Sequence, residues 1–228
     1  MLDAGCGTGA ITVGMARIVG PSGKAVGMDR DSGLLEIARQ DHQGQANLGF
    51  VDGDLLSCTF RDVFDVVTAA RALQWISDPG EAVVRMRAAT KPGGLVVALD
   101  YDHADNAWTP EPPPEFRRFY DAFLAWRAAN GWDNHMANHL PGLFAAAGLE
   151  SIEVHDDDQV TQRDDADSET AAGIWLHVIR DIGPRIVQAG FAQDGDVRAA
   201  DGTYSLWMRD AFERQELVMK TVVGVVPS

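Results

Sequence analysis

The chain has few cysteines and lacks any long hydrophobic run. Two Cys among 228 residues are too few for the disulfide framework of a small secreted domain. No apolar run is long enough to cross a bilayer, and no charged-then-apolar leader is visible. These features predict a cytoplasmic protein that does not act at a membrane.

Basic residues are also scarce, with 19 Lys and Arg against 34 Asp and Glu, for a net charge of −15. A nucleic-acid surface needs clustered Lys and Arg, and no basic stripe is present, so no nucleic-acid partner is expected. The acidic runs at 156–158 and 164–167 lack the spaced glycine and carbonyl ligands of a calcium loop. They are interpreted as solvated loops, and no metal is expected.

Glycine is concentrated near the N-terminus. Asp3 is followed by Gly5, Gly7 and Gly9, and glycine lets the backbone approach a ligand closely. Apolar residues then recur at helical spacing, at Ile11, Met15, Ile18 and Val19. A strand, a glycine loop and a helix N-terminus form the first unit of a nucleotide-binding α/β domain.

The glycine loop alone also fits a dinucleotide fingerprint, read as Gly5-x-Gly7-x-x-Ala10. A second expected strand ends at Asp29, where a carboxylate can meet ribose hydroxyls. Asp31 could instead cap the following helix. Asp54, after Gly53, follows a third expected strand. A nicotinamide-binding domain does not require an acidic residue at this position.

Taken in order, these motifs resemble those of the class I S-adenosylmethionine-dependent methyltransferases. Residues 3–9 look like the family's first motif, Asp29 its ribose acid and Asp54 its adenine-contacting acid. Residues 64–70 with 72–75 resemble its fourth-strand motif, and residues 91–95 the turn before its fifth strand. The similarity covers about the first hundred residues well and is greatest to the small-molecule group that includes ubiquinone and menaquinone enzymes.

The resemblance implies S-adenosyl-L-methionine as the cofactor. The residues that it assigns to cofactor binding are Asp3, Gly5, Gly7, Gly9, Asp29, Arg30, Gly53, Asp54, Leu55, Arg71 and Gln74. It implies an α/β fold, a Rossmann-like three-layer sandwich around a mostly parallel seven-stranded sheet. The implied strand order is 3-2-1-4-5-7-6, with the last strand antiparallel.

The pattern along the chain agrees with one α/β domain over residues 1–228. Strands are expected at 24–29, 48–52, 63–68, 95–99, 152–155 and 217–226, and helices at 32–40, 116–130, 134–147, 168–189 and 196–214. Asp78 is expected to cap a further helix that ends at residues 91–94, and residues 106–115 to form a loop. The segments 104–147 and 166–214 are expected to be helical insertions on the substrate side. The resemblance implies helices before the first strand, whereas Met1 lies inside that strand, so either the reading frame begins upstream or the chain is shortened and its site is opened.

The aromatic residues of 116–130 lie at helical spacing and are interpreted as a core-packing stripe. Cys6, in the glycine loop, is interpreted as a packing residue. Because the sulfonium methyl is already electrophilic, alignment of the acceptor is the main requirement, and no catalytic triad is visible.

A hydroxyl or acidic carbon acceptor can still need a base, for which His103, His135 and His139 are candidates. His135 and His139 are four residues apart and are expected on one helical face, a spacing that also suits a metal pair. Tyr101, Asp102 and Trp108 are candidates for the acceptor pocket because they follow the fifth strand. Gln74 and Trp75 follow the fourth strand, where relatives place residues near the methionine moiety.

The leading hypothesis is an enzyme that moves a methyl group to an O, N or C atom of a small molecule. The first alternative is an S-adenosylmethionine-binding protein without turnover, acting as a regulatory or assembly subunit. The second alternative is a nicotinamide-dependent oxidoreductase. A homodimer is possible under each hypothesis.

The net charge of −15 predicts that neither tRNA nor DNA is retained. Electrostatic binding to nucleic acid is strongest at low salt, so an electrophoretic mobility-shift assay in low-salt buffer is the most sensitive check. A shift of either probe under these conditions would contradict the prediction.

Overall fold

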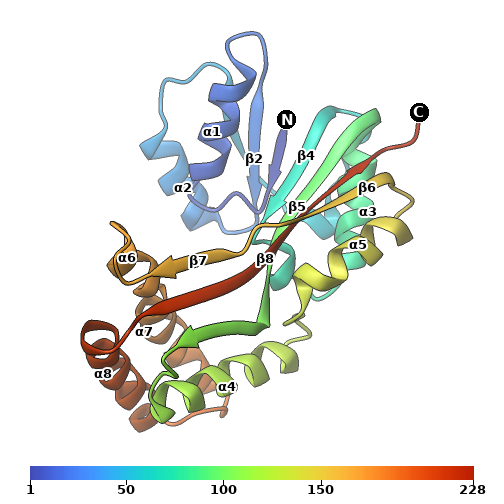
Figure 1. Cartoon of the computed structure of the whole chain (residues 1–228). Coiled ribbons are helices and arrows are strands. Elements are labelled where there is room, and N and C mark those ends of the chain that lie inside the picture. Colours follow the sequence, from blue (N-terminus) through green and yellow to red (C-terminus); the bar gives the residue numbers. More distant parts are fainter. The chain divides into compact units, whose positions relative to one another are not determined.

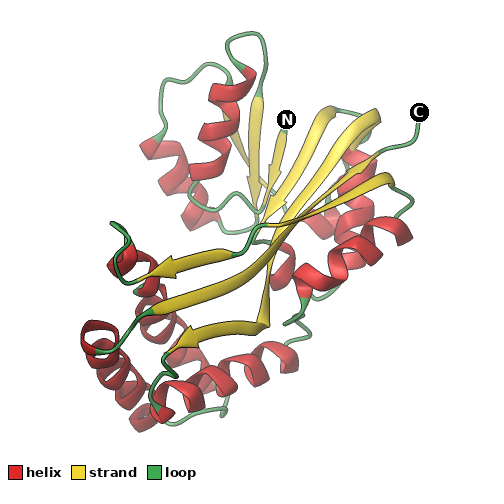
Figure 2. Cartoon of the chain, in the orientation of Figure 1, coloured by secondary structure: helices red, strands yellow, loops and turns green.

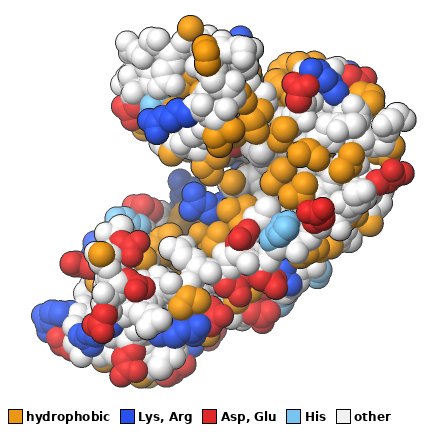
Figure 3. All heavy atoms as spheres, turned by 45° about the horizontal axis from the view of Figure 1, so that its top comes forward, with side chains coloured by type: hydrophobic (Ala, Val, Ile, Leu, Met, Phe, Trp, Pro, Cys, Tyr) orange, Lys and Arg blue, Asp and Glu red, His pale blue; other side chains and the backbone are white.

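The computed structural model describes residues 1–228, which divide into two compact units. Unit 1 consists of residues 1–101, 136–156 and 220–228, and unit 2 of residues 102–135 and 157–219. No helix is both long enough and apolar enough to span a membrane. Acidic and basic side chains are interspersed on the face drawn in Figure 3.

Unit 1 is built on a sheet whose central strands are parallel (Figures 1 and 2). These strands are β1 (Leu2–Ala4), β2 (Ala25–Asp29), β3 (Leu48–Asp52), β4 (Phe64–Ala70) and β5 (Thr90–Thr109). β6 (Glu150–Asp156) pairs antiparallel with β8 (Arg214–Val225). Because β1 pairs with both β2 and β4, the glycine loop that follows β1 emerges at the middle of the sheet edge.

The strand order is β3-β2-β1-β4-β5-β8-β6. It confirms the expected order, with the last strand inserted between the fifth and the sixth. The sheet has one more strand than expected, because β7 (Gln159–Gln162) pairs with β8. The polar sequence of β7 carries too little hydrophobic alternation to be recognised as a strand.

Helices pack on both faces of the sheet in unit 1. α1 (Ala10–Val19) contributes Met15 and Ala16 to one apolar cluster, while α3 (Pro79–Ala89) and α5 (Met136–Ala146) contribute to a separate, larger cluster. α2 (Ser32–Asp41) packs on β2 and β3. Separate clusters on the two faces are what a three-layer sandwich requires.

Unit 2 contains α4 (Pro114–Ala129), α6 (Ser168–Ala172), α7 (Ile174–Gln188) and α8 (Asp194–Asp210), with β7 and parts of β5 and β8. Every aromatic residue of the α4 stripe is at most 7% exposed. Phe116 stacks on Tyr204 of α8 with ring centroids 4.3 Å apart, and Trp175 of α7 lies edge-on to Tyr120 at 5.0 Å. The prediction of a core-packing stripe is confirmed.

The expected elements differ from the structure around β5. Residues 91–94 lie within this strand rather than forming a helix-ending turn, and the strand continues to Thr109, into the segment expected to be a loop. Hydrogen bonds explain the extension at both ends: Gly93 N donates to Val226 O over 2.9 Å, and Glu213 N to Thr109 O over 3.0 Å. These partners are more than 100 residues away in the sequence, so local signals do not reveal them.

The buried face of α1 also differs from the expected one. Its buried residues are Thr12, Val13, Met15 and Ala16, whereas Ile18 is 82% exposed. The hydroxyl of Thr12 donates to the carboxylate of Asp3 over 2.6 Å, so this polar side chain faces inward. α5 begins at Met136, so His135 precedes the helix, and the expectation that it shares a helical face with His139 is wrong.

Gly5 and Gly44 both have a positive φ, but only Gly5 is crowded. A Cβ on Gly5 would lie 2.5 Å from the Cβ of Ala72, whereas a Cβ on Gly44 would meet nothing within 4 Å. Gly5→Ala is therefore expected to lower the free energy of unfolding by about 1–3 kcal/mol more than Gly44→Ala. Urea denaturation of both variants measures this difference. Equal losses in the free energy of unfolding would show that Ala72 moves to accommodate the new Cβ without destabilising the protein.

Candidate functional site

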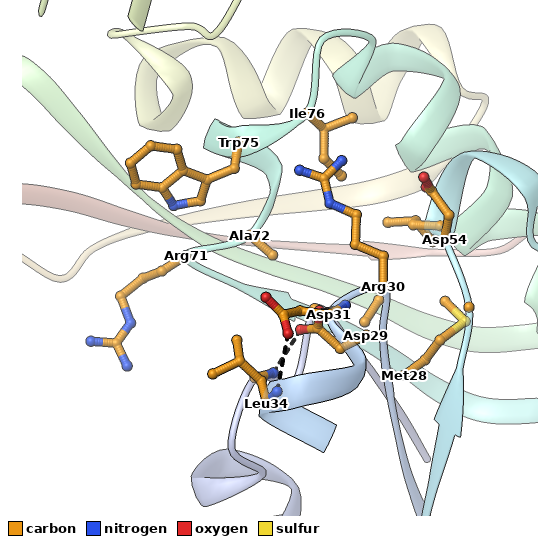
Figure 4. Close-up of a pocket in the computed structure, with 15 residues that line it drawn as sticks. Met28, Asp29, Arg30, Asp31, Leu34, Asp54, Arg71, Ala72, Trp75 and Ile76 are labelled. Carbon is orange, nitrogen blue, oxygen red and sulfur yellow. Dashed lines mark hydrogen bonds between the residues drawn. The ribbon is translucent and has the colours of Figure 1, made fainter. Parts of the chain in front are cut away.

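A cleft of about 330 Å³ opens where β1, β2, β3 and β4 end (Figure 4). Its volume falls within the range of small-molecule sites, about 300–1,000 Å³. The residues that line it are Ala4, Gly5, Gly7, Met28, Asp29, Arg30, Asp31, Leu34, Gly53, Asp54, Leu55, Arg71, Ala72, Trp75 and Ile76. All of them belong to unit 1.

Backbone hydrogen bonds tie the glycine loop down to the end of β2. Gly5 N and Cys6 N both donate to Met28 O, over 2.7 and 3.1 Å, and Gly9 N donates to Cys6 O over 2.9 Å. Gly7 N donates to Asp29 Oδ2 over 2.8 Å. The amide groups of these four residues therefore point into the protein rather than forming an outward cradle for a phosphate.

The Asp29 carboxylate links two segments at the end of β2. While Oδ2 accepts from Gly7 N, Oδ1 accepts from Asp31 N over 2.9 Å. Asp31 caps α2, because its side chain accepts from Gly33 N and Leu34 N. The capping role considered for either acid thus belongs to Asp31, while Asp29 fixes the glycine loop.

Gly53 and Asp54 bring the end of β3 to the same cleft. Gly53 N donates to Asp29 O over 3.0 Å, and Asp54 Oδ1 accepts from Leu56 N over 2.9 Å. A Cβ on Gly53 would lie 3.0 Å from Met28 Sδ. This packing aligns the ends of β2 and β3, so the carboxylates of Asp29 and Asp54 line the same wall of the cleft.

Eight of the eleven residues expected to bind a cofactor line the cleft: Gly5, Gly7, Asp29, Arg30, Gly53, Asp54, Leu55 and Arg71. Three do not line it. Gln74 is 2% exposed, and its backbone N donates to Asp100 Oδ2 over 3.0 Å. Gly9 is the N-cap residue of α1, where a Cβ would lie 2.6 Å from the Phe50 ring.

Asp3 lies beneath the glycine loop rather than in the cleft. It is 1% exposed, and its carboxylate accepts from Thr12 Oγ1 over 2.6 Å and Thr68 Oγ1 over 3.4 Å. Burial raises its pKa above the usual value, and the two threonine hydroxyls oppose that shift. Cys6 is also buried, which raises the pKa of its thiol to about 12, so the expectation of a packing residue is confirmed.

The lining residues beyond the eleven expected to bind the cofactor are Ala4, Met28, Asp31, Leu34, Ala72, Trp75 and Ile76. Their shared signal is position, since most lie within a few residues of the carboxyl end of β1, β2 or β4. Ligands of open α/β sheets bind outside such ends. Trp75, expected near the methionine moiety, lies on the wall formed by the segment after β4 (Figure 4).

The three candidate histidines occupy different environments. His103 is 7% exposed among the rings of Phe123 and Trp175, and desolvation together with the charge of Arg127 lowers its pKa to about 3. His103 is therefore a neutral core residue and poorly suited to take up a proton. The His135 side chain is 49% exposed, with Nδ1 3.2 Å from the fully buried Asp102 Oδ2. His139 is exposed on α5.

The proposed acceptor residues were expected after the fifth strand but lie within β5, and they are buried: Tyr101 is 8% exposed, Asp102 0% and Trp108 6%. Trp108 Nε1 donates to Gln215 Oε1 over 3.0 Å, so it takes part in the core of unit 2. Asp102, Asp105 and His135 bring potential metal-ligand atoms within 4.8 Å of one another. Asp102 Oδ1 accepts from the N–H groups of Ala104 and Asp105, each over 3.2 Å.

Comparisons with known proteins agree with this geometry. Residues 2–98 match the family described as "Methyltransferase domain". A demethylmenaquinone methyltransferase from Staphylococcus carnosus (strain TM300) is 28% identical over 173 residues, covering 67% of this chain and 68% of that protein. One from Staphylococcus aureus (strain JH9) is 34% identical over 125 residues, covering 54% of this chain and 48% of that protein.

Solved structures share the fold at low sequence identity. A phosphoethanolamine N-methyltransferase 2 from Haemonchus contortus, in complex with S-adenosylhomocysteine, matches with a TM-score of 0.61 and 17% identity, covering 100% of this chain and 48% of that one. The [4+2]-cyclase SpnF matches with a TM-score of 0.58 and 17% identity, covering 99% and 74%. Different chemistries on one fold mean that the fold alone does not determine the reaction.

The matched family, the strand order and the ordered motifs around the cleft lead to one conclusion. Residues 2–98 are similar to a methyltransferase domain, and the strand order agrees with that similarity.

Proposed function

We propose that this protein transfers the methyl group of S-adenosylmethionine to a small-molecule acceptor. The observation that carries the proposal is the cleft of unit 1, into which Asp29 and Asp54 project from neighbouring strands beside the glycine loop. Carboxylates at strand ends suit the hydroxyl and amino donors of a nucleoside. The transfer needs alignment of acceptor, methyl and sulfur more than it needs a charged nucleophile on the protein.

Within this proposal, each part of the cofactor meets a different strand end. Asp29 accepts hydrogen bonds from the ribose hydroxyls, and Asp54 meets the adenine side. Gly5 and Gly7 allow the methionine portion to approach the backbone. A Cβ on Gly7 would meet nothing within 4 Å, which leaves this space for a ligand. Leu55 and Arg30 complete the adenosine side.

The hydrogen bonds of the loop favour this cofactor over a nicotinamide dinucleotide. A pyrophosphate is bound by outward backbone N–H groups at a glycine loop. Here the N–H groups of Gly5, Cys6, Gly7 and Gly9 have partners inside the protein, and the Gly7 partner is a carboxylate. A negative charge at this point repels a pyrophosphate but is compatible with a sulfonium cation.

The acceptor is proposed only by class. The relatives are described as demethylmenaquinone methyltransferases, and the chain spans 68% of one and 48% of the other. We propose that the segments 104–147 and 166–214 supply acceptor-binding residues within a single functional domain, in the cytoplasm. Among the candidate bases for an acceptor with an O–H or acidic C–H group, His135 has a side chain that is 49% exposed, with Nδ1 3.2 Å from Asp102 Oδ2.

The alternative is an S-adenosylmethionine-binding protein without turnover, because one fold can carry different functions, as the match to a [4+2]-cyclase illustrates. Incubating the protein with methyl-labelled S-adenosylmethionine and a small-molecule extract tests it. Label in a new extractable product supports methyl transfer. Cofactor binding without any labelled product, across extracts tested at several pH values, would support the alternative.

Isothermal titration should detect binding of S-adenosylmethionine and S-adenosylhomocysteine, and no comparable binding of NAD. The physical reason is the inward-facing amide groups of the glycine loop together with the Asp54 carboxylate. NAD binding tighter than S-adenosylhomocysteine would overturn the cofactor assignment.

Asp29→Ala should weaken S-adenosylhomocysteine binding far more than Asp31→Ala. Each hydrogen bond between a ribose hydroxyl and the Asp29 carboxylate contributes on the order of 1.5–3 kcal/mol. Loss of the Asp31 cap should instead lower the stability of the fold by about 1 kcal/mol. Affinity from calorimetry and thermal unfolding of both variants separate the two effects, and equal losses of affinity would count against the assignment.

A further inference from the structure

Three side chains that can bind a metal ion converge in unit 2. Asp102 and Asp105 belong to β5, and His135 lies in the turn just before α5. One ligand atom from each residue lies within 4.8 Å of those from the other two. All three residues are part of unit 2, and His139 is not a member of the cluster. One histidine and two carboxylates therefore take the place of the histidine pair that the sequence spacing suggested.

The distances suit the coordination shell of a small divalent cation. His135 Nδ1 lies 3.2 Å from Asp102 Oδ2. In a tetrahedral zinc site, with metal–ligand bonds of about 2.0–2.1 Å, two ligand atoms are about 3.3 Å apart. These two atoms therefore already have the separation that a shared ion requires. The Asp105 side chain is exposed, so its rotation can bring a third ligand atom to the same ion.

The backbone near Asp102 is shaped so that both aspartates reach one place. In a flat strand, residues three positions apart point to opposite faces. Here the N–H groups of Ala104 and Asp105 both donate to Asp102 Oδ1, each over 3.2 Å. The chain therefore turns around the Asp102 carboxylate, whose other oxygen, Oδ2, lies on the side of His135.

Hydrogen bonds also fix the turn that carries His135. The backbone O of Asn134 accepts from His103 N over 2.8 Å, which fastens the turn to β5. The Asn134 side chain accepts from Arg127 Nε over 2.8 Å and donates to Leu124 O over 3.0 Å, which fastens it to α4. Residues behind the ligands of a metal site commonly orient those ligands in this way.

Burial and charge favour a cation at this position. Asp102 is 0% exposed, and a buried carboxylate is more stable beside a positive charge. The side chains of Asp105 and His135 are exposed, so an ion can reach the buried carboxylate from solvent. The net charge of −15 attracts cations to the chain as a whole.

We propose that Asp102, Asp105 and His135 bind one divalent metal ion with the ligand preference of Zn²⁺. Two carboxylate oxygens and one imidazole nitrogen match the ligands that zinc takes, and three protein ligands leave a fourth position for water. Mg²⁺ prefers an octahedral shell of oxygen ligands, so the His135 nitrogen favours Zn²⁺. An imidazole that binds a metal through Nδ1 carries its proton on Nε2, so His135 does not act as a base while the ion is bound.

Calorimetric titration of Zn²⁺ into protein without a histidine tag, pretreated with a chelator and dialysed, tests the site. The wild type should bind one equivalent of Zn²⁺ and bind Mg²⁺ more weakly. Zn²⁺ should also raise its unfolding temperature, because only the folded chain brings the three ligands together. Asp105→Asn and His135→Gln should each weaken Zn²⁺ binding at least about 10-fold, since loss of an outer-shell partner alone costs about 10- to 100-fold.

Asp121→Asn is the matched control. It removes an exposed carboxylate from α4 of the same unit and should bind Zn²⁺ as the wild type does. The residues changed in all three variants are exposed, so each variant should unfold at the wild-type temperature when no metal is present.

The absence of Zn²⁺ binding by the wild type would overturn the site, as would equal affinity in the wild type, Asp105→Asn and His135→Gln. Weakening by His135→Gln alone would show binding to a surface histidine, and would also overturn it. Equal weakening by Asp121→Asn and Asp105→Asn would show that overall charge, rather than the cluster, attracts the ion. None of these measurements depends on methyl transfer, so they are independent of the proposed function.

Discussion

The Asp29 carboxylate is the interaction on which the cleft depends. With one oxygen it accepts from Gly7 N, and with the other from Asp31 N. It thereby fixes the loop after β1 to the start of α2, while Met28 O accepts from the loop at two further points. These bonds direct the N–H groups of the glycine loop into the protein. The loop therefore presents Cα hydrogens and other backbone atoms, rather than N–H groups, to the cleft. The same hydrogen bonds give the loop its shape and make it unsuitable for a phosphate.

Burial of polar groups beneath the loop adds a second constraint. Asp3 has a raised pKa because it is buried, and it is stabilised by the hydroxyls of Thr12 and Thr68. The inward-facing Thr12 accounts for the rotation of α1 that exposes Ile18. A residue of the first motif thus has a structural role: it orients the helix that follows the loop, while the cleft itself is lined by its neighbours.

The second unit has a different construction. Its core is a set of aromatic rings from α4, α7 and α8 in edge-on and stacked contacts. His103 is part of this core, where burial suppresses its protonation, whereas the His135 side chain is 49% exposed, with Nδ1 3.2 Å from Asp102 Oδ2. Two histidines that look equivalent as candidate bases are therefore separated by their environments.

Much of unit 1 was predictable because its signals are local. The glycine spacing, the acid at each strand end and the Asp78 cap lie within a few residues of the features that they specify, and the structure has the corresponding turns, strands and helix start. Eight expected residues line the cleft for the same reason: parallel strands end at one edge, so residues after consecutive strands converge there.

The sequence by itself determined the glycine loop and the acids that line the cleft, since both are encoded in short motifs, and the resemblance carried by these motifs implied the strand order. Only the tertiary structure decided the 20-residue length of β5, the pairing of the polar strand β7, and which of Asp29 and Asp31 holds the loop. It also showed that Asp3, Gly9 and Gln74 support the cleft without lining it. These features depend on hydrogen bonds and packing between residues distant in sequence, and on burial, which local patterns do not encode.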